Sequence, residues 1–373
     1  MNFGFTEEQE FLRSTAREFL QRECPMTRVR ELMETERGYD PGLWEKMAEL
    51  GWLGLLLPQD LGGSGLGFVD LLVLLEELGR ALTPSPYLGN LLGSLALLQV
   101  GNETQRKEIL PAVASGQQIL TLAVTEAPGT QSPAALQARA ERHAAEYRLT
   151  GTKLFVPDGQ NADRFVVVAR TGGEGEEGLS LLLVPRSAPG VTVRPLRGID
   201  PTRRIAEVRF SDAPAEPLGA EGSAAGSWER IRDVGLMALA ADALGGSAAA
   251  LEASVAYAKQ RIQFGKPIGV NQAIKHKCAD MLIELESSRS ITWYAAWALD
   301  AAPEEARLAT AMAKAYTGDA YRHITAENIQ IHGGVGFTWE YDCHLYFKRA
   351  KSDEVIFGGP SEQRERVAQM MRL

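Results

Sequence analysis

Two stretches in the C-terminal half combine residue types that could bind a phosphorylated ligand carrying an aromatic ring system. Residues 261–268 read Arg-Ile-Gln-Phe-Gly-Lys-Pro-Ile. Arginine offers a planar cation that pairs with phosphate, and phenylalanine offers a flat face for a ring. Residues 330–340 read Gln-Ile-His-Gly-Gly-Val-Gly-Phe-Thr-Trp-Glu, and Gly-Gly at a helix end lets a ligand approach the backbone closely. Taken singly, each feature is also explained by an ordinary helix C-terminus.

Other nucleotide, nucleophile and metal motifs are not matched. The glycine-rich run 62–67 lacks the Lys-Ser/Thr of a phosphate loop, and Leu66 stands where a nucleophile turn needs its second glycine. No strand–GxGxxG–helix fingerprint occurs, so a Rossmann site is not expected. The five histidines are scattered, and the adjacent pair Cys343-His344 would point to different faces of a helix. We therefore predict no metal site.

Composition indicates a globular chain with an acidic balance. The 373 residues are 45% hydrophobic and 23% charged, which is enough apolar material for a large core. The net charge is −9 without a Lys/Arg-rich block, so nucleic acid is not an expected partner. Three cysteines without CxxC spacing exclude a disulfide framework and fit a reducing compartment. Because we find neither a signal segment nor a membrane span, the expected location is the cytoplasm.

The periodicity of apolar residues changes twice along the chain, which predicts three domains. Helical spacing dominates up to about Gly116, beginning with a capping-box pattern at Thr6-x-x-Gln9. Short β-type runs bounded by Gly and Pro then recur at spacings of roughly ten residues. From Ser227 onward the pattern is helical again, in long alanine-rich segments. The predicted domains are residues 1–118, 119–220 and 221–373.

The fold class that follows is α+β, with helices and strands in separate domains. Closely spaced strands without crossover helices indicate an antiparallel β-barrel or sandwich in the middle. Small residues inside the long C-terminal helices allow close approach and indicate a four-helix-bundle-like domain. The expected helices of the first domain are 42–50, 68–82, 89–100 and 104–114, and the expected strands are 120–124, 164–169, 179–184, 191–193 and 206–210.

Together with the early run from Leu50-Gly51-Trp52 to Glu76-Glu77-Leu78-Gly79, these stretches resemble the acyl-CoA dehydrogenase flavoprotein family over essentially the whole chain. The resemblance implies that family's fold and an FAD between the middle and C-terminal domains, completed by a neighbouring subunit. It implies that an arm of this chain reaches the neighbour's FAD. The implied cofactor-binding residues are Thr125 and Phe155 at the flavin ring, Arg261, Gln263 and Phe264 on the arm, Gln272, and Gln330, Gly333 and Gly334 on the adenosine side.

The resemblance also implies a reaction and its partners. In that family a carboxylate removes the α-proton of an acyl-CoA thioester while a β-hydride passes to flavin N5, and an electron-transfer flavoprotein usually accepts the electrons. Such a base needs a raised pKa in an apolar pocket. The acyl pocket is implied to lie near residues 87–97 and 235–245. The implied assembly is a homo- or hetero-oligomer with a dimer core, and a dimer of dimers is expected.

The sequence departs from the family pattern at the positions of the catalytic base and of residues that contact the flavin. In Ile-Phe-Gly-Gly-Pro, residues 356–360, Gly358 occupies the position of the usual catalytic glutamate. Some relatives carry the base on the first long helix of the C-terminal domain, and the matching position is Gly235. Pro157 replaces a Ser/Thr that would contact flavin N5, and Gln131 replaces a serine. Arg349 stands where an aspartate is usual.

No catalytic residue can therefore be assigned from the sequence. Four carboxylates lie near the two glycines, namely Glu354, Glu362, Glu229 and Asp233, and an exposed surface role is the ordinary explanation of each. The favoured hypothesis is a subunit of a heteromeric dehydrogenase whose paralogous partner supplies the glutamate. The alternatives are a dehydrogenase with an unrecognised base, a base-free acyl-CoA flavoenzyme such as a desulfinase, and a non-catalytic FAD- or acyl-CoA-binding subunit.

Overall fold

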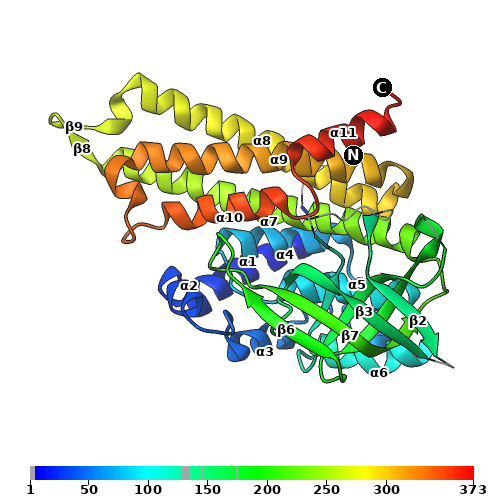
Figure 1. Ribbon diagram of the computed structural model, residues 1–373. Helices are drawn as coiled ribbons and strands as arrows, with labels where there is room; N and C mark the ends of the chain where they lie inside the picture. Colours follow the sequence, from blue (N-terminus) through cyan, green and yellow to red (C-terminus); the bar gives the residue numbers. More distant parts are fainter. Residues whose placement is uncertain (1–4, 128, 130–134, 144–145, 174) are drawn as a thin grey trace.

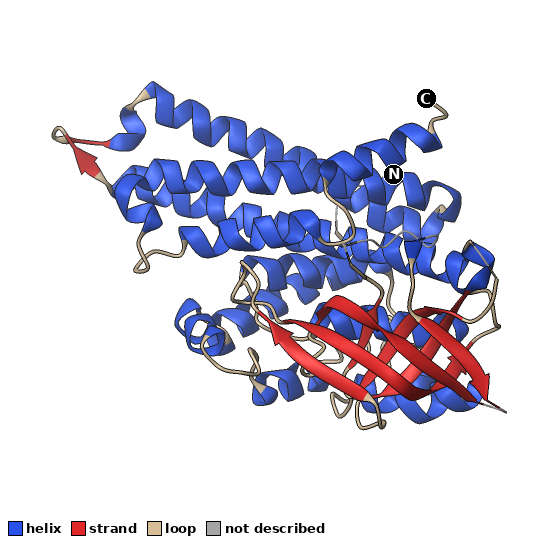
Figure 2. Cartoon of the chain, in the orientation of Figure 1, coloured by secondary structure: helices blue, strands red, loops and turns tan. Residues whose placement is uncertain are grey.

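The computed structural model describes residues 5–127, 129, 135–143, 146–173 and 175–373, and it has three parts (Figure 1). Figure 2 shows the strands of the large sheet gathered on one side of the molecule and a small hairpin at the opposite end, with the long C-terminal helices lying across the N-terminal helices and the sheet. The N-terminal helices are α1 (Glu7–Glu23), α2 (Met26–Met33), α3 (Pro41–Glu49), α4 (Phe68–Arg80), α5 (Tyr87–Val100) and α6 (Glu103–Ala114). Each helix expected in this region is present within two residues of its expected ends.

Local sequence signals explain where these helices begin and how they pack. At the start of α1, the Gln9 amide donates to Thr6 Oγ1 at 3.2 Å and the Thr6 amide donates to Gln9 Oε1 at 3.1 Å, which forms the expected capping box. Helices α4 and α5 are buried on nearly every face, because both are covered on several sides. They form the centre of the molecule, between the sheet and the C-terminal helices.

The middle part is a closed sheet, as the spacing of short strands indicates. Its order is β1-β4-β2-β3-β7-β5, a β4–β5 pairing closes it into a barrel, and β6 pairs with β7. Most pairings are antiparallel, but β1 and β2 run parallel to β4. The strands are β1 (Leu120–Ala123), β2 (Arg139–His143), β3 (Glu146–Pro157), β4 (Arg164–Arg170), β5 (Leu179–Pro185), β6 (Val191–Leu196) and β7 (Ile205–Leu218).

Strands β2 and β3 are not predicted from the sequence, and β7 is longer than predicted. Strand β2 reads Arg-Ala-Glu-Arg-His and buries only one side chain, so it lacks an apolar run. Strand β3 is interrupted by Gly151, and its register on β7 shifts at two places. Strand β7 continues through the segment 214–217, whose prolines suggest a turn. Polar exposed strands and irregular registers weaken the alternation on which strand prediction depends.

The C-terminal part is a bundle of long helices. The helices are α7 (Ala224–Gln260), α8 (Gln272–Ala301), α9 (Pro303–His332), α10 (Cys343–Val355) and α11 (Pro360–Met370). By length and hydropathy alone α7 could cross a membrane, but 94% of its most apolar window is buried within the protein. That burial explains the composition of α7, because it packs against α4, α5, α8, α9 and α10.

A buried arginine joins the barrel to the bundle. Arg349 on α10 is 1% exposed. It donates to Asp200 Oδ2 at 2.6 Å and to Thr202 Oγ1 at 2.5 Å, both in the turn between β6 and β7. It also donates to Asp242 Oδ1 on α7 at 3.1 Å. One guanidinium thus holds three segments that are far apart in the sequence.

A second arginine extends this buried network. Arg203 lies in the same turn between β6 and β7 and donates to Asp353 Oδ1 on α10 at 2.5 Å. Its other terminal nitrogen lies 3.1 Å from Asp242 Oδ1, so Asp242 pairs with two arginines. The departure noted at position 349 is therefore a structural ion network at the joint between domains.

We expect Arg349→Ala to lower the free energy of unfolding by about 3–5 kcal/mol, because buried carboxylates would lose their counter-charge. The matched control is Arg194→Ala, which removes an exposed arginine paired with Glu207 in the barrel and should leave stability unchanged. Urea denaturation followed by circular dichroism, at one protein concentration, measures both. Equal urea midpoints for the two variants would contradict a stabilising network.

Candidate functional site

A cavity of about 330 Å³ lies where the barrel meets the turn between α10 and α11. Its walls are mostly apolar, with Thr125 as the polar side chain among them. Phe155 is 51% exposed at this cavity and has a φ of 53°, a conformation that non-glycine residues seldom adopt. The lining residues are Leu122, Val124, Thr125, Gly129, Leu154, Phe155, Val156, Pro157, Val355, Ile356 and Phe357.

A buried ion pair supports the polar end of this cavity. The Glu126 carboxylate, next to Thr125, accepts from Lys153 Nζ at 2.6 Å and from the amides of Gln137 and Ala138 at 2.6 and 3.0 Å. Burial lowers the pKa of Lys153 to about 8, although Glu126 favours its charged form. This pair fixes the chain that follows β1, and no local pattern in the sequence predicts that Lys153 is its cation.

The other sequence-predicted cofactor residues lie at the opposite end of the molecule. A hairpin of β8 (Ile262–Gln263) and β9 (Lys266–Pro267) extends beyond the bundle, far from the barrel (Figure 1). Arg261 and Gln263 are exposed there, and Phe264 at the tip is fully exposed. Gln272, at the start of α8, and Gln330, at the end of α9, are exposed too. One chain therefore does not bring the two groups of predicted residues together.

The exposed group has free capacity for a ligand. Within the described part of the chain, the Arg261 guanidinium donates to no carboxylate or carbonyl. Gly333 and Gly334 begin the short helix η5 (Gly333–Phe337), and a Cβ added to either would meet no atom within 4 Å. These glycines are not required by packing inside this chain, although Gly333 has a φ of 66°. An unpaired guanidinium beside open backbone fits a phosphate-bearing group supplied from outside the chain.

The two positions that could carry the base are glycines in different surroundings. A Cβ at Gly235 would lie 2.7 Å from Cε2 of Phe357. A Cβ at Gly358 would lie 2.6 Å from Oε2 of Glu362, and the φ of Gly358 is 92°. Helix α10 ends at Val355 and α11 begins at Pro360, so Gly358 lies in the break between the two helices. Neither glycine could be replaced by glutamate without rearrangement.

The neighbouring carboxylates are not arranged as a base. Arg366 on α11 donates to Asp233 Oδ1 at 2.8 Å and to Glu229 Oε2 at 3.0 Å. Asp233 is buried rather than exposed as expected, and its burial raises its pKa despite Arg366. Glu354 lies beside Lys351 and does not line the cavity, whereas Glu362 is exposed. No carboxylate lines the cavity among the residues that the structure describes.

Two further positions, 157 and 131, differ from the family residues that would contact the flavin. Pro157 lines the cavity and has no amide hydrogen, and its carbonyl accepts from Thr121 Oγ1 at 2.6 Å. It therefore offers no donor to a ligand in the cavity. Gln131 lies outside the described residues.

Comparisons with known proteins place this geometry in one family. The family models for the N-terminal, middle and C-terminal domains of acyl-CoA dehydrogenase match residues 6–117, 121–213 and 233–371. Acyl-CoA dehydrogenase IpdE2 of Mycolicibacterium smegmatis is 32% identical over 363 residues, covering 97% of this chain and 98% of that protein.

Two solved structures are similar over their full length. A chain from a study of the electron transferring flavoprotein of Acidaminococcus fermentans has a TM-score of 0.92 at 28% identity, covering 100% of this chain and 99% of that chain. A chain of the ChsE4–ChsE5 complex from Mycobacterium tuberculosis has a TM-score of 0.90 at 28% identity, with the same coverage.

We expect Gly358→Ala to lower the free energy of unfolding by about 1–2 kcal/mol, because a side chain is strained at positive φ and would also meet Glu362. Gly226→Ala is the matched control, since this glycine lies in the first turns of α7 with nothing near its Cβ position. The control should stabilise by about 0.5–1 kcal/mol. Thermal unfolding of both variants measures the effects, and a Gly358→Ala variant as stable as the control would refute the strain.

Proposed function

The chain belongs to the acyl-CoA dehydrogenase family, and from that premise we propose that it is an FAD-binding subunit that depends on a partner chain for the proton-abstracting carboxylate. The reaction is the α,β-dehydrogenation of an acyl-CoA thioester. One observation carries the proposal. Both positions at which the base could stand are glycines, and no described carboxylate lines the cavity.

The residues present fit an FAD shared between two chains. Thr125 and Phe155 would hold the ring end at the barrel cavity, while Arg261, Gln263, Phe264, Gln272, Gln330, Gly333 and Gly334 would contact the phosphate and adenosine end held by a neighbour. When bound, FAD supplies the hydride acceptor. The exposure of the hairpin and the lack of a partner for Arg261 among the described residues support this assignment, because an exposed guanidinium is available to pair with a phosphate from a neighbouring chain.

The partner in this proposal is a paralogous chain of the same fold. Such a pair would place the hairpin of each chain against the cofactor of the other, within a dimer or a dimer of dimers. The resemblance to a chain of the ChsE4–ChsE5 complex supports an assembly of two different chains. An electron-transfer flavoprotein is the proposed electron acceptor, and a cytoplasmic location remains a prediction.

The first prediction concerns the protein purified alone. We expect its flavin absorbance to stay unbleached when a panel of acyl-CoA thioesters is added without oxygen, because no carboxylate lines the cavity among the residues that the structure describes. Co-expression with a paralogue that carries the glutamate should give a complex that bleaches. Bleaching of the lone chain would contradict dependence on a partner.

The second prediction concerns the arm. We expect Arg261→Ala to lower the flavin content of the purified assembly at least several-fold, because a phosphate would lose its cation. Arg209→Ala is the control, since this exposed arginine lies on β7 in the barrel. Unchanged flavin content in Arg261→Ala would overturn the cofactor assignment.

A further inference from the structure

The inner end of the barrel cavity is closed by one aromatic ring. Phe357 lies in the turn between α10 and α11, is only 7% exposed and has a φ of 59°. Its ring packs edge-on against Trp228 of α7, with centroids 5.8 Å apart. A positive φ is unfavourable for a residue with a side chain. Because Phe357 adopts it while its ring is buried, the packing around the ring determines where the ring lies.

Phe357 and Gly235 are matched in shape. The ring atoms Cε2 and Cδ2 of Phe357 would lie 2.7 and 3.0 Å from a Cβ at Gly235, and Cδ2 of Leu92 on α5 would lie at 3.5 Å. The ring thus fills the space between α5 and α7 that the missing side chain leaves. A smaller residue at 357 would extend the 330 Å³ cavity into that space.

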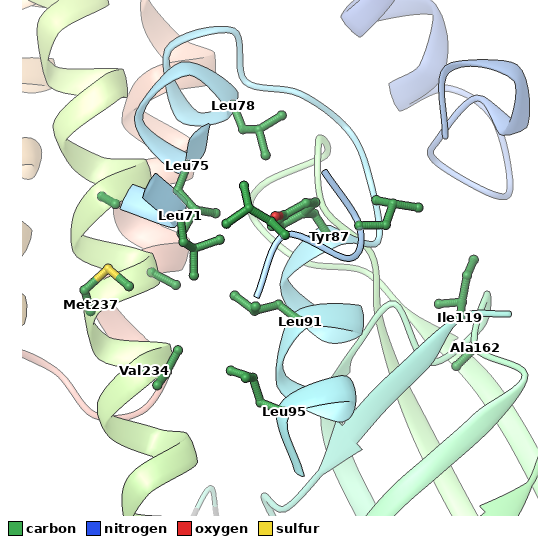
Figure 3. Packing of buried hydrophobic residues seen from close by; sticks show 14 of the residues in the cluster. Leu71, Leu75, Leu78, Tyr87, Leu91, Leu95, Ile119, Ala162, Val234 and Met237 are labelled. Carbon is green, nitrogen blue, oxygen red and sulfur yellow. The ribbon is translucent and has the colours of Figure 1, made fainter. Parts of the chain in front are cut away.

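Next to this point α5 and α7 pack directly on each other. Leu91 and Leu95 of α5 point toward Val234 and Met237 of α7 (Figure 3). The ring of Phe357 belongs to a second cluster of buried side chains. That ring occupies the space between the two helices at the missing side chain of Gly235.

We propose that Phe357 limits the acyl chain that this subunit can bind. Its ring leaves room in the cavity for the thioester end of a ligand but excludes an extended acyl chain. This inference rests on the proposed function, because it takes a CoA thioester as the ligand. A long-chain thioester would then be held by the partner subunit.

The test compares the affinities of the full-length chain for two thioesters by calorimetry, in the absence of oxygen. Wild-type protein should bind octanoyl-CoA no more tightly than butyryl-CoA, because the ring keeps the additional methylenes out of the cavity. Phe357→Ala should bind octanoyl-CoA at least about tenfold more tightly than butyryl-CoA, because four further methylenes become buried. Phe357→Leu, which keeps more of the core, should show a smaller preference of the same sign.

The matched control is Phe19→Ala. Phe19 is also 7% exposed and also packs edge-on against a tryptophan, Trp52, at 5.1 Å. It lies on α1, away from the cavity lining. This variant should lose stability without gaining a preference for the longer chain.

Three outcomes would overturn the proposal: a tenfold preference for octanoyl-CoA in the wild type, no preference in either Phe357 variant, or the same gain in Phe19→Ala. The flavin absorbance of the same samples reports the proposed function separately. A flavin-free protein with the expected length dependence would contradict the cofactor assignment and leave the role of Phe357 standing.

Discussion

The buried guanidinium of Arg349 is the interaction on which the geometry of this chain depends. It joins the turn between β6 and β7 to α7 and α10, and Asp242 receives a second arginine from the same turn. Burying so many charges stabilises a fold only when each is paired, so the network specifies one arrangement of barrel against bundle. The cavity needs that arrangement, because its walls come from β1 and β3 on one side and from the turn after α10 on the other.

The chain carries one part of a binding site at the barrel and another part at the hairpin, at opposite ends of the molecule. At the barrel end, Thr125 rests on the Glu126–Lys153 pair, and the turn after α10 closes the cavity. At the hairpin end, Phe264 and Arg261 are presented to solvent without partners in the described chain. The exposure of an aromatic ring and an unpaired arginine is explained when a second chain covers them. The glycines at positions 235 and 358 lie in one half of the arrangement, and the residues of the hairpin half are unaffected by them.

Much of the fold could be predicted from the sequence, whereas the interior of the site could not. The helices follow from apolar spacing and from caps such as Thr6 with Gln9, and the barrel follows from the spacing of its strands. Strands β2 and β3 were missed because exposed polar residues hide the alternation. The glycines at 235 and 358 are visible in the sequence, but the ring that occupies the space beside Gly235 is not. Tertiary neighbours such as Phe357 and Gly235 are far apart in sequence, and no local pattern links them.

Helix α7 connects the two ends without a break. Gly235 lies near its start and Arg261 follows its last residue, so 26 helical steps separate them, a rise of about 39 Å at 1.5 Å per residue. The helix fixes an angle as well as a distance, since each residue turns the chain by about 100°. Inserting or deleting a single residue within α7 would therefore turn the hairpin by about 100° around the helix axis relative to the cavity. In the proposed assembly, the residue count of α7 therefore sets both the separation and the relative direction of the cavity and the hairpin.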